Sequence, residues 1–214
     1  MRRVMVLLMA TISIGMTSCG RDEKVSTPLS FEQYFTSFGY DFEPAKDRSD
    51  LAERSLLVVE AILVDVIDGP IFGETADDPY ASRFALFVFE SDLVSGPISV
   101  RLPRPDTSDI AEIRVAMPLG ARAVLYLVPT PDPAPFEQKL WFNLELSKGD
   151  LAKTLWDVTT PQGFLLEVPF ETGLVGVIGP LHGAEGLADS PAEGSDLASW
   201  LPPGGPVVPR EITK

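Results

Sequence analysis

The sequence is poor in cysteine and histidine. Its 214 residues contain one cysteine, Cys19, and one histidine, His182. A single cysteine excludes an internal disulfide, and a zinc site built from cysteine and histidine needs more ligands than this chain has. A Ser-His-Asp triad would depend on His182, which lies in a glycine-rich stretch, and no nucleophile-elbow motif accompanies it. These absences argue against the commonest catalytic and metal-binding arrangements.

Basic residues are also scarce. The chain has 17 Lys and Arg against 31 Asp and Glu, which gives a formal net charge of −14. Such a surface repels nucleic-acid phosphates and anionic lipid head groups, so we expect no nucleic-acid partner. The sequence contains no phosphate-binding Gly-Lys-Ser/Thr motif and no dinucleotide fingerprint, so it predicts no cofactor.

The one strongly apolar run near the start of the chain is too short to span a bilayer. It extends over Val4–Met16, whereas a spanning helix needs about 20 residues. Arg2 and Arg3 precede the run, and small residues follow it. This order of charged, apolar and small residues is typical of a signal peptide, which we assign to residues 1–18.

The tripeptide Met16-Thr17-Ser18 before Cys19 resembles the lipobox of bacterial lipoproteins, with Met16 where that family usually has leucine. The resemblance implies a diacylglyceryl group on the sulfur of Cys19 and cleavage in front of it. Residues 19–29 then form a lipidated tether, and the chain resides on the extracytoplasmic face of a bacterial membrane. The alternative is an ordinary secretory signal that leaves Cys19 as a free thiol.

Turn-forming residues are abundant, with 20 prolines and 17 glycines. Between them lie short β-branched or alternating runs, which predict a mainly β fold: a small barrel or sandwich of about six strands over residues 30–180. One or two short helices are expected at its N-terminal side, at 30–38 and 47–54. Residues 181–214 are rich in Gly, Pro and acidic residues and predict a weakly ordered tail. The strand candidates are Leu56–Ile67, Arg83–Val94, Ile98–Leu102, Arg122–Val128, Leu140–Leu146, Phe164–Phe170 and Leu174–Ile178.

The order of elements over residues 45–130 carries a second resemblance. A short helix precedes the long strand Leu56–Ile67, a second strand ends in Leu93–Pro97, and Leu119–Leu127 follows. This order resembles the oligonucleotide/oligosaccharide-binding (OB)-like barrels of exported bacterial proteins and of netrin- and metalloprotease-inhibitor-type domains. The resemblance implies an OB-like architecture. The disulfides of the animal relatives have no counterpart here, and no inhibitory residue carries over.

Tryptophans and loop carboxylates are the remaining candidates for a site. Trp141 lies on the polar face of an alternating strand and, with Trp156, is a candidate ligand-binding surface for a sugar or peptide. Asp68, Asp77 and Asp78 lie in one glycine-containing loop and are calcium candidates, although their spacing matches no EF-hand and a solvated acidic turn is the simpler interpretation.

Three classes of function follow. The leading hypothesis is a lipid-anchored, non-catalytic binding module for an envelope protein or glycan. The second is a cell-envelope hydrolase that uses loop carboxylates. Glu60 and Asp65 do not suit that role, because five residues apart on a strand they lie on opposite faces. The third is an inhibitor-like structural domain.

Overall fold

The computed structural model describes residues 34, 43–105, 108–131, 140–143, 151–169, 175–178, 187–191 and 195–214. Within these ranges eight strands form one sheet in the order β5-β1-β2-β3-β6-β4-β7-β8. The helices are α2 (Arg48–Glu53) and α3 (Ile110–Ala116), with 3-10 turns η1 (Leu151–Lys153), η2 (Pro161–Gly163), η3 (Leu197–Trp200) and η4 (Arg210–Ile212). The strands are β1 (Leu57–Gly73), β2 (Ser82–Glu90), β3 (Ile98–Pro103), β4 (Arg122–Pro129), β5 (Leu140–Phe142), β6 (Leu155–Val158), β7 (Phe164–Pro169) and β8 (Val175–Ile178).

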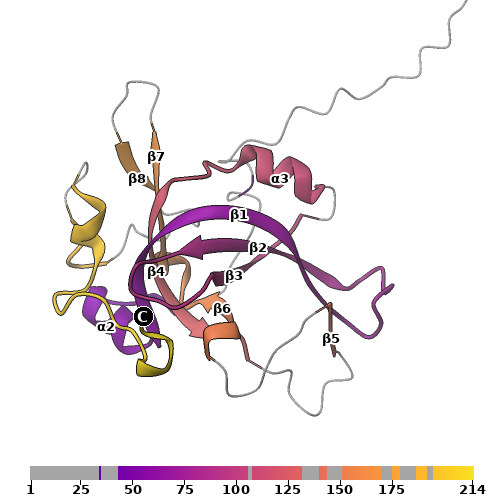
Figure 1. Ribbon diagram of the computed structural model, residues 1–214, viewed down its shortest axis with the longest axis horizontal. Helices are drawn as coiled ribbons and strands as arrows, with labels where there is room; N and C mark the ends of the chain where they lie inside the picture. Colours follow the sequence, from indigo (N-terminus) through magenta and orange to yellow (C-terminus); the bar gives the residue numbers. More distant parts are fainter. Residues whose placement is uncertain are drawn as a thin grey trace, which may run out of the picture.

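The sheet closes on itself because β1 pairs with two neighbours. Its first part pairs with β4 and its later part with β2, so β1, β2, β3, β6 and β4 form a ring (Figure 1). The join between β3 and β6 is parallel, and the other pairings in the ring are antiparallel. A closed ring of five strands is a small β barrel. The predicted mainly β fold is therefore confirmed.

The core of the ring follows from strand alternation. Successive side chains of a strand point to opposite faces, so every second residue enters the barrel. Phe87 and Phe89 of β2 and Val100 of β3 are fully buried there, and Phe164 packs edge-on against both phenylalanines. Tyr34 is buried in the same core, and its hydroxyl donates to the Pro103 carbonyl at 2.5 Å. Otherwise the predicted helix at 30–38 lies outside the described residues.

The helices are confirmed only in part. α2 coincides with the helix expected at 47–54, and its N-cap is Asp47, whose side chain accepts a hydrogen bond from the amide of Asp50. The carboxylate of Asp50 forms an ion pair with Arg54 at 2.7 Å. This carboxylate also accepts a hydrogen bond from the amide of Lys46, and that hydrogen bond together with Arg54 lowers the pKa of Asp50. α3 lies between β3 and β4 and not on the N-terminal side, and Asp109 begins it with a capping box.

Strand β1 continues past the expected stop at Asp68-Gly69-Pro70 and ends at Gly73. The pairing register with β2 shifts between Asp68 and Ile71, so a bulge absorbs the proline that would otherwise interrupt the ladder. Gly69 is required there, because a Cβ on it would lie 2.6 Å from the carbonyl oxygen of Phe84. The residues Asp68-Gly69-Pro70, which are typical of a turn, therefore form a bend within one strand.

The sequence pattern misses β6 (Leu155–Val158), which closes the ring between β3 and β4. Its four residues are too few for an alternating pattern to be recognised. The strand is held by two pairings with β3 and three with β4, which only the assembled barrel brings to it.

The described part of the expected weakly ordered tail, residues 187–191 and 195–214, packs on the barrel. Leu197 and Trp200 of η3 are buried against the outer side of β1 and β4. The hydroxyl of Tyr126 donates to the Trp200 carbonyl at 2.7 Å, and burial raises the pKa of that hydroxyl. Val207 pairs with Val58 through two backbone hydrogen bonds. The apolar residues of this proline-rich segment pack against residues of β1 and β4 that are distant in the sequence, so no local pattern predicts this packing.

Replacing Gly69 by alanine tests the bulge. The added Cβ would contact the backbone of β2, so we expect Gly69→Ala to lower the free energy of unfolding by about 1–3 kcal/mol. The matched control is Gly204→Ala, because a Cβ there meets no atom within 4 Å. Urea denaturation should show the control within about 0.5 kcal/mol of the parent. Equal stability of both variants would contradict the close packing at Gly69.

Candidate functional site

Trp141 lies in a cluster of side chains from five strands, and its ring is packed against its neighbours there. We call the group Phe72, Phe84, Arg101, Trp141 and Asp157 the Trp141 cluster. The guanidinium carbon of Arg101 lies 4.5 Å from the ring centre of Phe84 and 4.4 Å from that of Trp141. The Phe72 and Trp141 ring centres are 4.7 Å apart. Trp141 therefore packs against a cation of its own chain.

The ion pair of this cluster crosses the join of the ring that has the fewest residue pairings. Arg101 of β3 binds both carboxylate oxygens of Asp157 of β6, at 2.7 and 2.6 Å, and Thr130 donates to the same carboxylate. The two charged side chains are only 15% and 19% exposed. Because β3 and β6 share just two residue pairings, this bidentate contact supports ring closure. Trp141 has a structural role here.

Trp156, the other predicted ligand-binding residue, is 2% exposed and belongs to the barrel core. The prediction of a ligand surface at Trp156 is wrong. Its strand was not recognised from the sequence, so the direction of its side chain could not be deduced.

Two of the three carboxylates proposed for calcium, Asp68 and Asp78, bind groups of the protein. Asp68 lies in β1 and pairs with Arg104 at 2.7 Å. Asp78 accepts hydrogen bonds from the amides of Glu74 and Tyr80, which is the ordinary role of aspartate in a turn. Asp77 is exposed. The described part of the chain contains no group of three or more metal-binding side chains.

Cys19, the predicted lipid-attachment residue, lies outside the described residues, as do the signal peptide and the tether. No helix within the described ranges is long and apolar enough to cross a bilayer.

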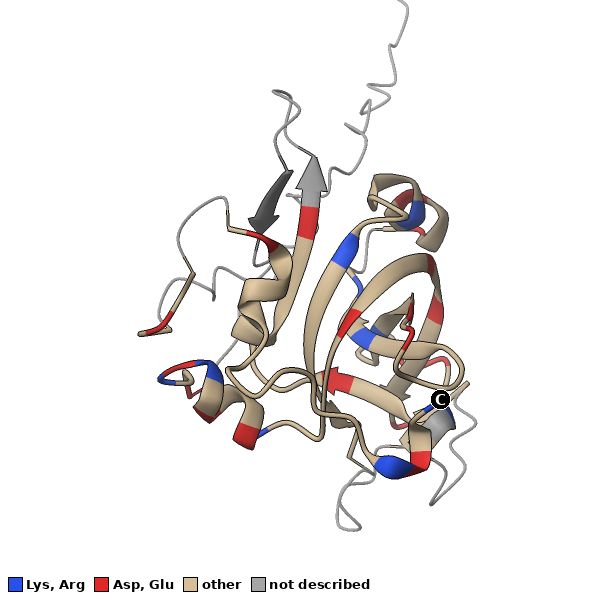
Figure 2. Ribbon diagram, turned by 60° about the vertical axis from the view of Figure 1, so that its left-hand side comes forward, with Lys and Arg blue, Asp and Glu red and all other residues tan. Residues whose placement is uncertain are grey.

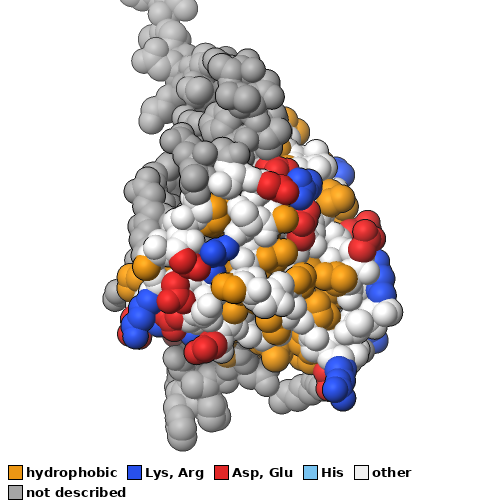
Figure 3. Space-filling model, turned by 90° about the vertical axis from the view of Figure 1, so that its left-hand side faces the viewer, with side chains coloured by type: hydrophobic (Ala, Val, Ile, Leu, Met, Phe, Trp, Pro, Cys, Tyr) orange, Lys and Arg blue, Asp and Glu red, His pale blue; other side chains and the backbone are white. Residues whose placement is uncertain are grey.

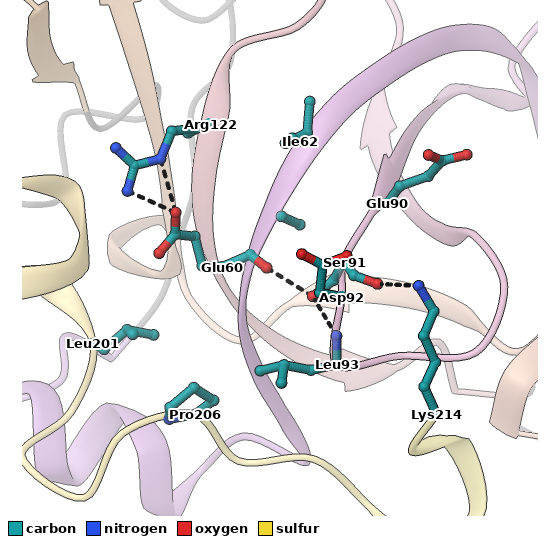
Figure 4. A pocket seen from close by; sticks show the side chains of 11 residues that line it. Glu60, Ile62, Glu90, Ser91, Asp92, Leu93, Arg122, Leu201, Pro206 and Lys214 are labelled. Carbon is teal, nitrogen blue, oxygen red and sulfur yellow. Dashed lines mark hydrogen bonds and ion pairs between the residues drawn. The ribbon is translucent and has the colours of Figure 1, made fainter.

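The structure shows a cleft that the sequence does not reveal. It has a volume of about 450 Å³ and lies between β1, the residues after β2 and the C-terminal segment; we call it the β1–β2 cleft (Figure 4). Its apolar lining comes from Ile62, Leu93, Leu201 and Pro206. Leu201 and Pro206 are contributed by the segment expected to be weakly ordered, so the cleft exists only because that segment packs on the barrel.

One side of the cleft is an ion-pair network. Arg122 of β4 binds Glu60 at 2.7 Å and is also approached by Glu167 at 3.5 Å and Asp196 at 3.6 Å. The hydrogen bond to Glu60 raises the pKa of Arg122. With three carboxylates around one guanidinium, this side remains negative.

Carboxylates also line the other side, where β2 ends. Glu90 stands opposite Ile62 in the β1–β2 ladder, and Asp92 follows two residues later. Neither carboxylate makes an ion pair or hydrogen bond within the described ranges. Between them, Ser91 is nearly buried, and its hydroxyl donates to the Glu60 carbonyl at 2.8 Å. Figure 2 shows that acidic residues also occur on many other elements.

Glu60 and Glu90, two of the three carboxylates that line the cleft, do not converge as the paired carboxylates of a hydrolase would. Glu60 is directed to Arg122, and the Glu90 side chain points away from it (Figure 4). Asp65, another carboxylate on β1, pairs with Arg114 at 2.6 Å. A general acid and a general base must reach the same reacting group, which these positions do not permit.

Apolar side chains continue from the cleft along the outer face of β1. Ile62, Val64 and Ile67 are 46%, 37% and 43% exposed. Figure 3, viewed from the side of α2 and the C-terminal segment, shows hydrophobic side chains gathered on the surface. The sequence signal for this face is the apolar character of both alternating sides of Leu56–Ile67.

Comparisons of the chain with protein-family models, with curated proteins and with solved structures find no match. The candidate site therefore rests on its own geometry.

Replacing Arg101 by lysine tests the structural role of the Trp141 cluster. Lysine loses the two-pronged contact with Asp157 and the planar contact with both rings, so we expect Arg101→Lys to lower the free energy of unfolding by about 1.5–3 kcal/mol. The control is Arg114→Lys, whose side chain is 55% exposed and whose effect should stay within about 0.5 kcal/mol. Chemical denaturation monitored by tryptophan fluorescence measures both; a neutral Arg101→Lys would show that the cluster does not support the ring.

Proposed function

We propose that this protein is a lipid-anchored, extracytoplasmic binding module without catalytic activity, and that it binds an envelope protein through the outer face of β1 and the β1–β2 cleft. The observation that carries the proposal is the exposure of Ile62, Val64 and Ile67 beside that cleft. Neighbouring apolar side chains on an exposed sheet face are typical of an interaction surface.

This exposure is not a consequence of an incomplete core. The inward residues of β1, such as Val59 and Leu63, are fully buried inside the ring, and the outward Val58 is covered by Leu197 and Trp200. Farther along the strand, Ile62, Val64 and Ile67 are 46%, 37% and 43% exposed. The same strand therefore has a covered beginning and, after it, exposed apolar side chains that are available to a partner.

A protein partner suits this surface better than a glycan. Glycan sites use exposed aromatic rings, and the ring of Trp141 already contacts Arg101 and Phe72. The aliphatic face of β1 offers apolar contact area, which favours a protein chain.

The proposed anchor fits a surface of this charge. Two acyl chains on Cys19 hold a protein stably at a membrane, whereas one acyl chain gives marginal binding. A net charge of −14 repels anionic head groups, so the barrel would stay off the lipid surface at the end of its tether. The face of β1 then remains accessible to other envelope proteins.

Replacing Cys19 by serine tests the anchor. In a bacterial host that exports the full chain, we expect Cys19→Ser to move the protein from the membrane fraction to the soluble fraction, because serine cannot carry the thioether-linked lipid. Mass spectrometry of the parent's N-terminal peptide should show the diacylglyceryl group on Cys19. An unmodified Cys19, or a cytosolic product that retains Met1, would refute the anchor.

A photoactivatable amino acid tests the binding face in the same cells. At Ile67 it should give a discrete crosslinked protein, whereas at Val115, an exposed apolar residue of α3 that is 87% accessible, it should not. Identical adducts from both positions, or none from Ile67, would contradict binding through β1.

A further inference from the structure

We infer that the β1–β2 cleft binds a cationic side chain, lysine or arginine, presented by a peptide segment with apolar neighbours. The inference rests on the proposed binding function and specifies its ligand chemistry. It starts from two carboxylates on the cleft, those of Glu90 and Asp92, which have no partner within the described chain. Most arginines that lie near acidic residues form ion pairs. The carboxylates of Glu90 and Asp92, in contrast, remain available to a ligand.

The cleft already holds an ammonium group of its own chain. The Nζ of Lys214 donates to the backbone carbonyl of Ser91 at 2.8 Å, and its side chain extends along the cleft toward β2 (Figure 4). That contact uses one of three ammonium donors, and Lys214 forms no ion pair with a described carboxylate. The cleft therefore accommodates a cation. The ammonium group of Lys214 is bound there by one neutral acceptor, the carbonyl of Ser91.

The charge around the cleft favours a cation over an anion. The lining carboxylates are Glu60, Glu90 and Asp92, and the lining cations are Arg122 and Lys214. Arg122 is further neutralised by two carboxylates outside the lining. An anionic ligand would face an excess of negative charge, whereas an incoming guanidinium or ammonium would gain the unpaired Glu90 and Asp92.

The apolar lining extends the description of the ligand. Ile62, Leu93 and Leu201 provide surfaces for aliphatic carbon, and a volume of about 450 Å³ accommodates more than one side chain. A lysine or arginine stem with an adjacent aliphatic residue matches both the walls and the charge. A free inorganic cation would leave the apolar walls uncovered.

The test uses the purified full-length chain in uncharged detergent micelles and two unlabelled probes, an alternating Leu/Lys hexapeptide and a Leu/Glu hexapeptide, measured by isothermal titration calorimetry. We expect saturable binding of the Leu/Lys peptide only. The double variant Glu90→Gln with Asp92→Asn should bind it at least tenfold more weakly. Lys214→Ala should bind it severalfold more tightly, because the internal competitor is gone.

The matched control is Glu74→Gln with Asp77→Asn, which removes the same two charges from exposed positions outside the cleft lining. It should bind within twofold of the parent. Equal losses of affinity in both double variants would indicate a general charge effect and would overturn the inference. Binding of the Leu/Glu peptide, or the absence of saturable binding, would also overturn it. So would an unchanged affinity in Lys214→Ala. If the peptide result is negative while crosslinking at Ile67 persists, the binding module stands and only the cationic ligand is refuted.

Discussion

The double pairing of β1 is the constraint from which the rest of the structure follows. One strand reaches β4 with its first residues and β2 with its later ones only if it is long and bends on the way. Register shifts after Leu63 and after Asp68 provide the bends, and Gly69 lets the β2 backbone approach. Once β1 has curved, the short β6 can complete the ring, and Arg101 and Asp157 reinforce that join.

The closed ring also decides which apolar residues become a core and which become a surface. Inward residues of β1 fill the barrel, and the outward Val58 joins a second core with α2 and the C-terminal segment. Ile62 lines the cleft together with Leu201 of that segment, and Val64 and Ile67 farther along the strand remain exposed. The cleft forms at this boundary on β1, next to the end of β2, where Glu90 and Asp92 lie.

Much of the fold could be predicted from local patterns. The strands now seen as β2, β3 and β4 were expected close to their observed positions, because alternation and flanking Gly or Pro residues are local signals. The candidate site was not predictable in the same way. The residues around Trp156 form no pattern that predicts the direction of its side chain. The residues around Trp141 do not predict that its ring contacts Arg101, forty residues earlier.

The sequence by itself determined the mainly β character, the absence of disulfide and Cys/His zinc chemistry, and the acidic surface, since these depend on residue types and short periodicities. Only the tertiary structure decided that Leu201 and Lys214 meet Ile62 and Ser91 in one cleft. Contacts between residues more than a hundred positions apart depend on how the barrel curves, and no short stretch of sequence encodes that curvature alone.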